Sequence, residues 1–327
     1  MKAFVFEEYG SPDVLAIKEV AKPTPKDDEV LIKVQATAVN PLDWHRLRAD
    51  PFLVRFSEGL SKPKNSFIGA DIAGVVETVG KNVTQFQPGD AVYGEIGSGG
   101  LAEYACAAEK VIAPKPDNIS FVEAAAVPVA AFTALQSLRD HGQLQAGQTV
   151  LINGASGGIG TYAVQIAKAM GAEVTAVCST RNLDLVQSIG ADHVIDYTQA
   201  DLAQCGQQFD LILDNVGNLS VAAYKRLLKD GGTAVVAGFT TMGRMFQVMV
   251  VGGISSKFGS KKIGSMLAQP NQADLLALNA LLESGQVKSV IDRCYPFTEA
   301  AEAIRYLENG RARGKVVVTM TQDSNGR

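Results

Sequence analysis

The chain has 327 residues, which is long for a single hydrophobic core, so we expect two domains. Its apolar content of 46% and charged content of 20% are ordinary for a globular protein. No apolar run reaches the roughly 18 residues needed to span a bilayer, and the net charge of −4 gives no electrostatic reason to bind nucleic acid or an acidic membrane surface. The composition therefore predicts neither a nucleic-acid partner nor a membrane partner.

The cysteines and the first residues bear on the cellular compartment. The four cysteines lie far apart, and no pair has the C-x-x-C spacing of a zinc or redox motif. Their spread suits a reducing compartment. Residues 1–6 start directly with strand-like alternation and leave no room for a signal peptide. We therefore expect a cytoplasmic protein.

The first 120 or so residues are rich in strand patterns. Apolar and polar side chains alternate in residues 29–39, which predicts a strand with one buried face. Residues 71–79 and 90–93 predict further strands, with turns at 80–82 and 88–90. Short strands with such turns indicate a compact barrel or sandwich.

From residue 150 onward, strand and helix patterns alternate. The expected strands are 150–153, 174–178, 193–195, 210–214 and 233–238, and the expected helices are 158–170, 183–189 and 220–228. This order predicts a parallel, doubly wound sheet with a ligand at the carboxyl ends of its strands. The last part of the chain predicts helices at 273–283 and 300–307 and a strand at 315–319, and there is no internal repeat.

A glycine-dense turn follows the strand at 150–153. Such a turn lets the backbone approach a pyrophosphate, and the helix that follows presents unpaired N–H groups. The spacing departs from G-x-G-x-x-G, and the alternative is a strand–helix turn that binds nothing. We expect a dinucleotide loop made of Gly154, Ala155, Ser156, Gly157, Gly158, Ile159 and Gly160.

The end of the next strand bears on the choice between NAD(H) and NADP(H). An NAD site places an acid there to accept hydrogen bonds from the ribose 2′-OH. This chain has Ser179, Thr180 and Arg181 instead, a combination that suits a 2′-phosphate. We therefore expect NADP(H). The alternative is that Arg181 only starts the next helix on a solvated face.

With these pieces in order, the chain resembles the medium-chain dehydrogenase/reductase superfamily, and within it the zinc-free quinone oxidoreductase and enone reductase branch. The resemblance covers residues 1 to about 319 and rests on segments 38–43, 69–74, 88–93, 100–104, 124–134, 190–192, 214–217 and 314–317. It implies an α/β protein with a GroES-like β-barrel catalytic domain and a Rossmann domain. The expected boundaries are 1–124 and 268–327 for the catalytic domain and 125–267 for the Rossmann domain.

The resemblance also implies that this chain binds no metal. Zinc enzymes of the superfamily place Cys where Asn40 stands and His-Glu where Ala70 and Asp71 stand. A catalytic zinc needs about three protein ligands. The three histidines (His45, His141 and His193) are not at those positions.

Three residues near the lost ligand position are catalytic candidates. Asn40 would donate from its amide to a substrate carbonyl or to the cofactor, and Asp43 would position its neighbours. The alternative for both is an Asn-Pro-x-Asp turn with Asx capping. His45 could return a proton to an enolate, or it could be an ordinary surface histidine.

Further residues are expected to contact the cofactor, by resemblance or because they end strands of the predicted sheet. They are Thr133, Tyr197, Asn215, Val216, Gly217, Gly238, Phe239 and Lys315. The alternatives are a helix cap for Thr133, an exposed loop residue for Tyr197, and a strand-start lysine for Lys315.

These observations predict an NADPH-dependent enzyme that transfers a hydride to a quinone or to an α,β-unsaturated ketone or aldehyde. A 2-enoyl thioester reductase is one alternative, in which basic residues bind a nucleotide-bearing carrier: Arg46, Arg48, Arg55, Lys62 and Lys64. An NADPH-binding structural or regulatory protein is another. The partner is a small electrophilic molecule, and the resemblance implies a homodimer through Rossmann edge strands. The apolar segment 244–259 could line the substrate mouth, belong to the core or cover that dimer edge.

Overall fold

The computed structural model describes residues 1–320, which divide into two compact units. Unit 1 comprises Met1–Val129, Pro270–Glu283 and the described residues from 289 onward. Unit 2 comprises Ala130–Gln269 and Ser284–Lys288. Unit 1 is therefore built from both ends of the chain.

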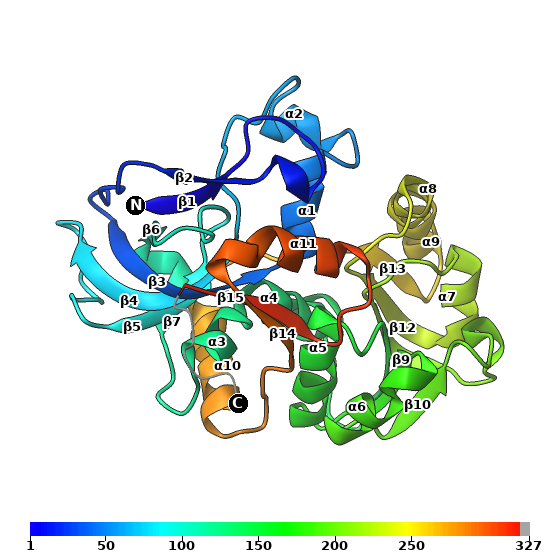
Figure 1. The fold of residues 1–327 in the computed structure, drawn as a ribbon. Coiled ribbons are helices and arrows are strands. Elements are labelled where there is room, and N and C mark those ends of the chain that lie inside the picture. Colours follow the sequence, from blue (N-terminus) through cyan, green and yellow to red (C-terminus); the bar gives the residue numbers. More distant parts are fainter. Residues whose placement is uncertain (321–327) are drawn as a thin grey trace. The chain divides into compact units, whose positions relative to one another are not determined.

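A seven-stranded sheet forms the centre of unit 1. Its order is β14-β15-β3-β4-β5-β7, and β6 also pairs with β3. The strands are β3 (Glu29–Val39), β4 (Asp71–Val79), β5 (Ala91–Glu95), β6 (Tyr104–Ala108), β7 (Ile112–Pro114), β14 (Ile291–Pro296) and β15 (Lys315–Thr319). The late strand β15 lies antiparallel beside the early strand β3, with Val316 opposite Val39 (Figure 1). This register brings Lys315 to the end of β3, directly before Asn40.

The remaining elements of unit 1 cover its sheet or connect its strands. They are the hairpin β1 (Lys2–Val5) and β2 (Ala16–Glu19) and the helices α1 (Pro41–Arg48), α2 (Val54–Glu58), α3 (Phe121–Ala125), α10 (Gln272–Glu283) and α11 (Ala300–Glu308). The alternation in β3 produces the expected buried face. Its residues Val30, Ile32 and Val34 pack in one buried cluster with Ile72 and Val76.

Unit 2 contains a parallel sheet of six strands in the order β10-β9-β8-β11-β12-β13. The strands are β8 (Thr149–Asn153), β9 (Glu173–Cys178), β10 (His193–Asp196), β11 (Phe209–Asp214), β12 (Leu228–Val236) and β13 (Lys262–Ser265). The order reverses between β8 and β11, the point at which doubly wound sheets bind their ligands. The predicted parallel Rossmann sheet is confirmed.

The helices of unit 2 connect these strands. They are α5 (Gly158–Ala169), α6 (Leu183–Ser188), α7 (Val221–Leu227), α8 (Met242–Phe246) and α9 (Gly253–Phe258), with most of α4 (Pro128–Gln136) and the π-helical segments η3 (Ser137–His141) and η6 (Gln247–Gly252). The edge strand β13 was not predicted, because Ile263 is its sole large apolar residue and gives no alternation to recognise.

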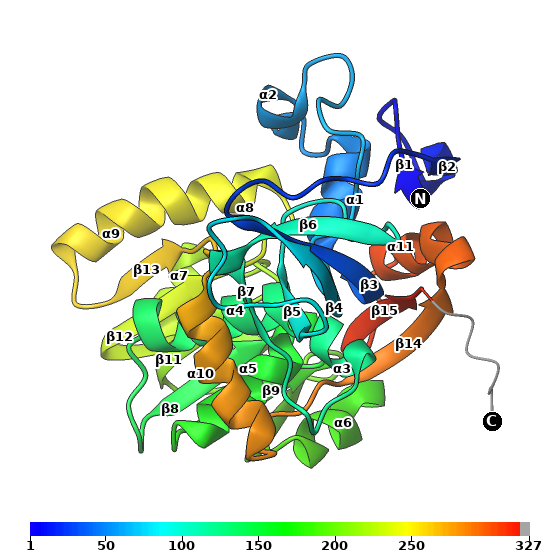
Figure 2. The same ribbon diagram turned by 90° about the vertical axis from the view of Figure 1, so that its left-hand side faces the viewer.

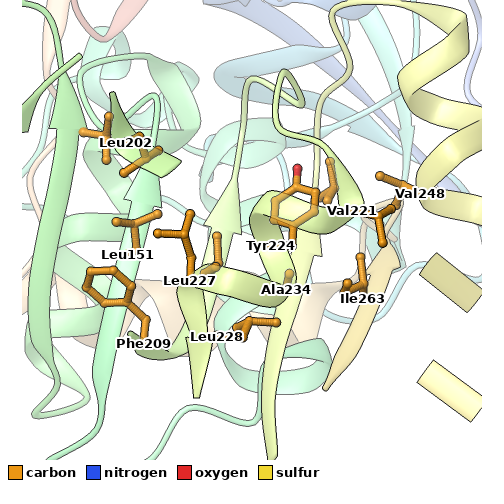
Figure 3. Close-up of a cluster of buried hydrophobic side chains, with 13 residues drawn as sticks. Leu151, Leu202, Phe209, Val221, Tyr224, Leu227, Leu228, Ala234, Val248 and Ile263 are labelled. Carbon is orange, nitrogen blue, oxygen red and sulfur yellow. The ribbon is translucent and has the colours of Figure 1, made fainter. Parts of the chain in front are cut away.

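One apolar cluster joins the sheet of unit 2 to helix α7 and the segment after β12 (Figure 3). Leu151 and Ile212 come from central strands, Tyr224 from α7, and Val248 from η6. Ile263 on the edge strand completes the contact with Val248. This core fixes the carboxyl ends of β8, β11 and β12, where the cofactor residues were expected.

Candidate active site and cofactor loop

The glycine turn after β8 has the backbone geometry that a dinucleotide loop needs. Gly154 has φ of +76°, a left-handed conformation that favours glycine. A Cβ on Gly160 would lie 2.1 Å from the carbonyl oxygen of Gly154, so the turn can close only with glycine there. Helix α5 begins after Gly157, and no side chain caps it. Its first N–H groups therefore suit an anionic ligand.

The loop after β11 contains an unsatisfied amide. Both polar side-chain atoms of Asn215 are buried without a hydrogen-bond partner among the described residues. Such groups are rare because an unpaired buried amide is unfavourable. Asn215 was expected to contact the cofactor, and its orphaned carboxamide fits a ligand that supplies a donor and an acceptor.

Asp214 holds this loop in place. Its carboxylate accepts hydrogen bonds from the backbone N–H groups of Val216 (2.9 Å) and Gly217 (2.8 Å) and from the hydroxyl of Tyr224 (2.7 Å). Burial raises the pKa of Tyr224, so that this phenol remains a proton donor. The side chain of Asn153 also donates to Asp214, at 2.9 Å.

The loops after β11 and β12 touch through their glycines. A Cβ on Gly217 would lie 2.0 Å from the carbonyl oxygen of Gly238, and a Cβ on Gly238 would lie 2.3 Å from that of Asn215. Phe239 packs against the apolar cluster of Figure 3. The expected residues 215–217 and 238–239 therefore lie side by side at the carboxyl ends of β11 and β12.

An acid from the neighbouring strand β10 lies beside the segment that follows β9, where the sequence predicted none. The hydroxyl of Thr180 donates to Asp196, the last residue of the neighbouring strand β10, at 2.5 Å. Hydrogen bonds from Thr180 and Thr198 lower the pKa of Asp196, which therefore carries a negative charge. Of the three residues expected to favour a 2′-phosphate, Thr180 thus donates its hydroxyl hydrogen to a carboxylate, and Ser179 accepts from the Asn182 amide at 3.3 Å.

Two other expected cofactor residues occupy contrasting places in unit 2. Thr133 is buried inside α4 rather than at its start, so it is not a helix cap. Tyr197 follows β10 and its side chain is 60% exposed. Ser156 in the glycine turn accepts a hydrogen bond from Asn182 at 2.8 Å, which ties the turn to the segment after β9.

In unit 1, Asn40 and Asp43 form a capping box at the start of α1. One oxygen of the Asp43 carboxylate accepts from the backbone N–H of Asn40 at 2.7 Å, and the other accepts from that of Gly69 at 3.0 Å. Burial raises the pKa of Asp43 to about 6, although these two N–H bonds oppose the rise. Asp43 therefore connects the end of β3 to the segment before β4.

The side chain of Asn40 belongs to a buried cluster with Asp71 and Lys315. Its oxygen accepts from the Lys315 ammonium at 2.5 Å, and its amide nitrogen donates to Asp71 at 2.9 Å and to the Ala38 carbonyl at 3.3 Å. Lys315 also pairs with Asp71 at 3.3 Å, and the two side chains are 3% and 0% exposed. Both amide hydrogens of Asn40 are thus engaged. The Lys315 ammonium has three N–H donors and uses two of them on Asn40 and Asp71, so it can donate one further hydrogen bond.

A further titratable group is coupled to this cluster from β5. Glu95 is the cross-strand partner of Asp71 in the pairing of β4 with β5. Burial, reinforced by the negative charge of Asp71, raises the pKa of Glu95 to about 7. Sequence reasoning missed Glu95, since nothing local distinguishes it from an exposed glutamate at a strand end.

His45 is not part of this cluster. Its ring stacks on Trp44, with centroids 3.6 Å apart, and its Nδ1 contacts the carbonyl oxygen of Asp50. Arg46, further along α1, donates to Glu58 at 3.0 Å and to the Gly97 carbonyl at 3.2 Å. The structure therefore supports Asn40 and Asp43 as neighbours but gives His45 a different environment.

The residues at the zinc-ligand positions do not suit a metal. Asn40 and Ala70 replace two ligands, and the remaining carboxylate, Asp71, is paired with Lys315 and accepts from the Val129 N–H at 2.9 Å. In residues 1–320 no group of three or more His, Cys, Asp or Glu could hold a metal ion. An ammonium lies where a zinc enzyme needs an open ligand set.

Comparison with known proteins agrees with this architecture. Residues 26–117 match a family described as the alcohol dehydrogenase GroES-like domain, and residues 189–318 match one described as zinc-binding dehydrogenase. A 2-methylene-furan-3-one reductase of Solanum lycopersicum is 39% identical over 97% of this chain and 79% of its own length. The chloroplastic NADPH-dependent alkenal/one oxidoreductase of Arabidopsis thaliana is 36% identical over the same shares.

Among solved structures, the quinone oxidoreductase from Coxiella burnetii superposes with a TM-score of 0.86 at 29% identity, covering 98% of this chain and 99% of that one. The chain therefore belongs to the medium-chain dehydrogenase/reductase superfamily. Within that superfamily it belongs to the quinone oxidoreductase branch.

Proposed function

We propose that this protein is an NADPH-dependent, metal-independent reductase of quinones or of α,β-unsaturated ketones and aldehydes. The observation that carries the proposal is the buried cluster of Lys315, Asn40 and Asp71 at the position of the zinc ligands. The relatives support the substrate class, since they are named as alkenal/one, methylene-furanone and quinone reductases.

The cofactor residues are those of unit 2. The backbone of residues 154–160 and the start of α5 suit the pyrophosphate, and the orphaned amide of Asn215 suits a polar group of the cofactor. NADPH supplies the reducing equivalents when it is bound. Ser179 and Arg181 would favour its 2′-phosphate, against the opposing charge of Asp196.

In this proposal the Lys315 ammonium replaces zinc as the positive charge that stabilises the substrate oxygen. Reduction of a conjugated carbonyl or a quinone places negative charge on oxygen, and a fixed positive charge stabilises that oxygen more in the transition state than in the ground state. Asn40 and Asp71 orient the ammonium, and Asp43 fixes the backbone of Asn40. Asn40 is therefore a positioning residue in this proposal rather than the direct donor.

A 2-enoyl thioester reductase is the second candidate function, because a trans-enoyl reductase of Aspergillus terreus is 36% identical over 90% of this chain. Part of the basic set expected to bind the carrier is engaged elsewhere. Two of the five basic residues that would bind a nucleotide-bearing carrier are engaged within unit 1, Arg46 with Glu58 and Arg48 with Glu308. Arg55 donates to the Leu60 carbonyl at 3.2 Å and lies over the ring of Tyr9. These contacts give the arginines structural roles.

The test is steady-state turnover by purified protein with NADPH or NADH, using quinones, enones, alkenals and enoyl thioesters as acceptors, together with metal analysis. We expect NADPH-dependent reduction of quinones or enones with no stoichiometric zinc. Cofactor binding without turnover would favour a structural or regulatory protein. One zinc per chain after dialysis would refute the metal-independent mechanism.

We also propose a homodimer that works in the cytoplasm. The edge strand β13 pairs on one side, with β12, and its free side supports association through the Rossmann sheet. The four cysteines are free thiols, which suits a reducing compartment. Sedimentation equilibrium tests the dimer, and fractionation of the native cell tests the compartment.

A further inference from the structure

Unit 2 exposes a stripe of large apolar side chains on the helical run from α8 through η6 to α9, which lies beside β13 (Figure 2). We call Phe246, Met249, Val250 and Ile254 the apolar stripe. They are 57%, 56%, 54% and 56% exposed, and their spacing places them on one side of the run. Exposed apolar patches of this kind mark interaction sites.

The opposite side of the same run is already packed. Val248 is 1% exposed in the core cluster, and Gly252 is buried, with its ideal Cβ position 3.1 Å from the Ile263 carbonyl oxygen. The hydroxyl of Ser256 bonds to the N–H of Ile263 at 2.8 Å. The run is therefore anchored to the sheet without the apolar stripe, which remains available to something outside the chain.

The charge of this region is opposite to that of the whole protein. Between Asp230 and Asp274 the sequence has no acidic residue, whereas the chain as a whole carries a net charge of −4. The same stretch has four basic residues: Arg244, Lys257, Lys261 and Lys262. Three of the four gather at the carboxyl end of α9, next to the apolar stripe.

A pocket of about 420 Å³ lies at that end of α9. It is lined by Lys225, Ile254, Ser255, Gly259, Ser260 and Lys261. The Lys261 ammonium is fixed there by the Lys225 carbonyl oxygen at 2.7 Å, and the carboxylate of Asp230, 89% exposed, lies 3.9 Å from it. The Ser260 hydroxyl donates to Asp230 at 3.2 Å. The two ammonium groups and the Ser255 hydroxyl beside Ile254 suit a phosphate group attached to an acyl chain.

We propose that this face of unit 2 docks on the surface of an anionic phospholipid membrane. The apolar stripe enters the boundary between headgroups and acyl chains, and the lysines bind headgroup phosphates. No helix in residues 1–320 is long and apolar enough to cross a membrane, so the contact is peripheral. The net charge predicted no membrane partner because it averages over the whole chain.

The charges favour a lipid surface over a second copy of the chain. A twofold interface places the same patch of each copy against the other. Here that would place two copies of the same cationic region against each other, each with four basic residues and no acid between Asp230 and Asp274. The proposal does not depend on the substrate assigned above.

The test is co-sedimentation of the protein with vesicles of phosphatidylcholine alone and of phosphatidylcholine with phosphatidylglycerol. We expect binding to the anionic vesicles that weakens in about 0.5 M salt. The variant K257Q/K261Q/K262Q should bind roughly 100-fold more weakly, since each lysine near such a surface contributes about a factor of five. F246S/V250S/I254S should bind at least ~10-fold more weakly.

Matched controls lie in unit 1. The variant K26Q/K81Q/K110Q changes the net charge equally, and Leu276→Ser removes another exposed apolar side chain, which is 49% exposed on α10. Both should bind like the wild type. All variants should keep the circular dichroism spectrum and the unfolding midpoint of the wild type, which shows that they fold.

Hydrogen exchange of the wild type gives a readout that needs no variant. Anionic vesicles should slow exchange in residues 242–261 and leave α10 unchanged. No binding to anionic vesicles, or no protection of this segment, would overturn the proposal. A change from dimer to monomer in F246S/V250S/I254S with lipid binding intact would assign the apolar stripe to a second copy instead.

Discussion

Replacing Lys315 by methionine tests whether its charge is structural or catalytic. The change keeps most of the side-chain volume but leaves the Asp71 carboxylate fully buried without its cation. Breaking a buried ion pair from one side costs about 3–5 kcal/mol. Asp71 keeps two donors, the Asn40 amide and the Val129 N–H, each at 2.9 Å. We therefore expect a loss near the lower end, about 3 kcal/mol of unfolding free energy at neutral pH.

The double variant K315M/D71N separates the two roles. With both charges removed, the amide of Asn40 can turn its oxygen toward the new amide at position 71, and stability should return to within about 1 kcal/mol of the wild type. Turnover should not return, because the positive charge is still absent. Loss of one such stabilising group costs roughly a hundredfold in kcat.

The assay combines denaturant unfolding, circular dichroism and steady-state kinetics for the wild type, both single variants and the double variant. The stability deficit of K315M should shrink as the pH falls, because burial raises the pKa of Asp71 and the unpaired carboxylate is neutralised by protonation. Recovery of both stability and turnover in the double variant would show that Lys315 is only structural. Full activity of K315M would refute the proposed mechanism outright.

Three further predictions address neighbouring groups. Asn40→Ala should lower kcat roughly a hundredfold while changing NADPH affinity less, because the ammonium loses its 2.5 Å partner; unchanged kcat with weaker NADPH binding would show that Asn40 serves the cofactor. Arg181→Ala should weaken NADPH by about 1–3 kcal/mol and leave NADH nearly unchanged in fluorescence titrations; equal wild-type affinities for the two cofactors would contradict the phosphate assignment. Glu95→Gln should match the wild type in unfolding free energy near pH 4 and exceed it by up to about 3 kcal/mol near pH 8, because a carboxyl whose folded pKa is raised to about 7 contributes stability that is lost as pH rises toward that value; parallel pH profiles would show that Glu95 is not buried enough to titrate abnormally.

The glycine turn and the strands around it were predictable because their signals are local. Gly154 and Gly160 are required by backbone conformation and close approach, and both lie within one short segment of sequence. The parallel sheet followed from alternating strand and helix patterns. The edge strand β13 could not be predicted, because its sequence has no apolar alternation. The expected domain boundaries at 124/125 and 267/268 stay predictions.

The partners of the candidate active site could not be predicted because they are distant in sequence. Lys315 and Asp71 are 244 positions apart, and the antiparallel pairings of β15 with β3 and of β3 with β4 bring them together. The sequence identifies Asp71 only as a residue at a zinc-ligand position and does not indicate its partner. The same limit applies to Thr180 and Asp196, which meet through the parallel pairing of β9 with β10.

The chemistry of the cluster argues that it is kept for function. A buried ion pair contributes little to stability compared with apolar residues of the same volume, because desolvation of both charges offsets their attraction. If the cluster served only to pack the end of β3, two apolar side chains could therefore replace the ion pair. The chain instead fixes an ammonium between Asn40 and Asp71, and the capping box of Asp43 fixes Asn40 in turn. Such preorganised charge is favourable where negative charge develops during a reaction. We therefore expect the K315M/D71N variant to regain stability without regaining turnover.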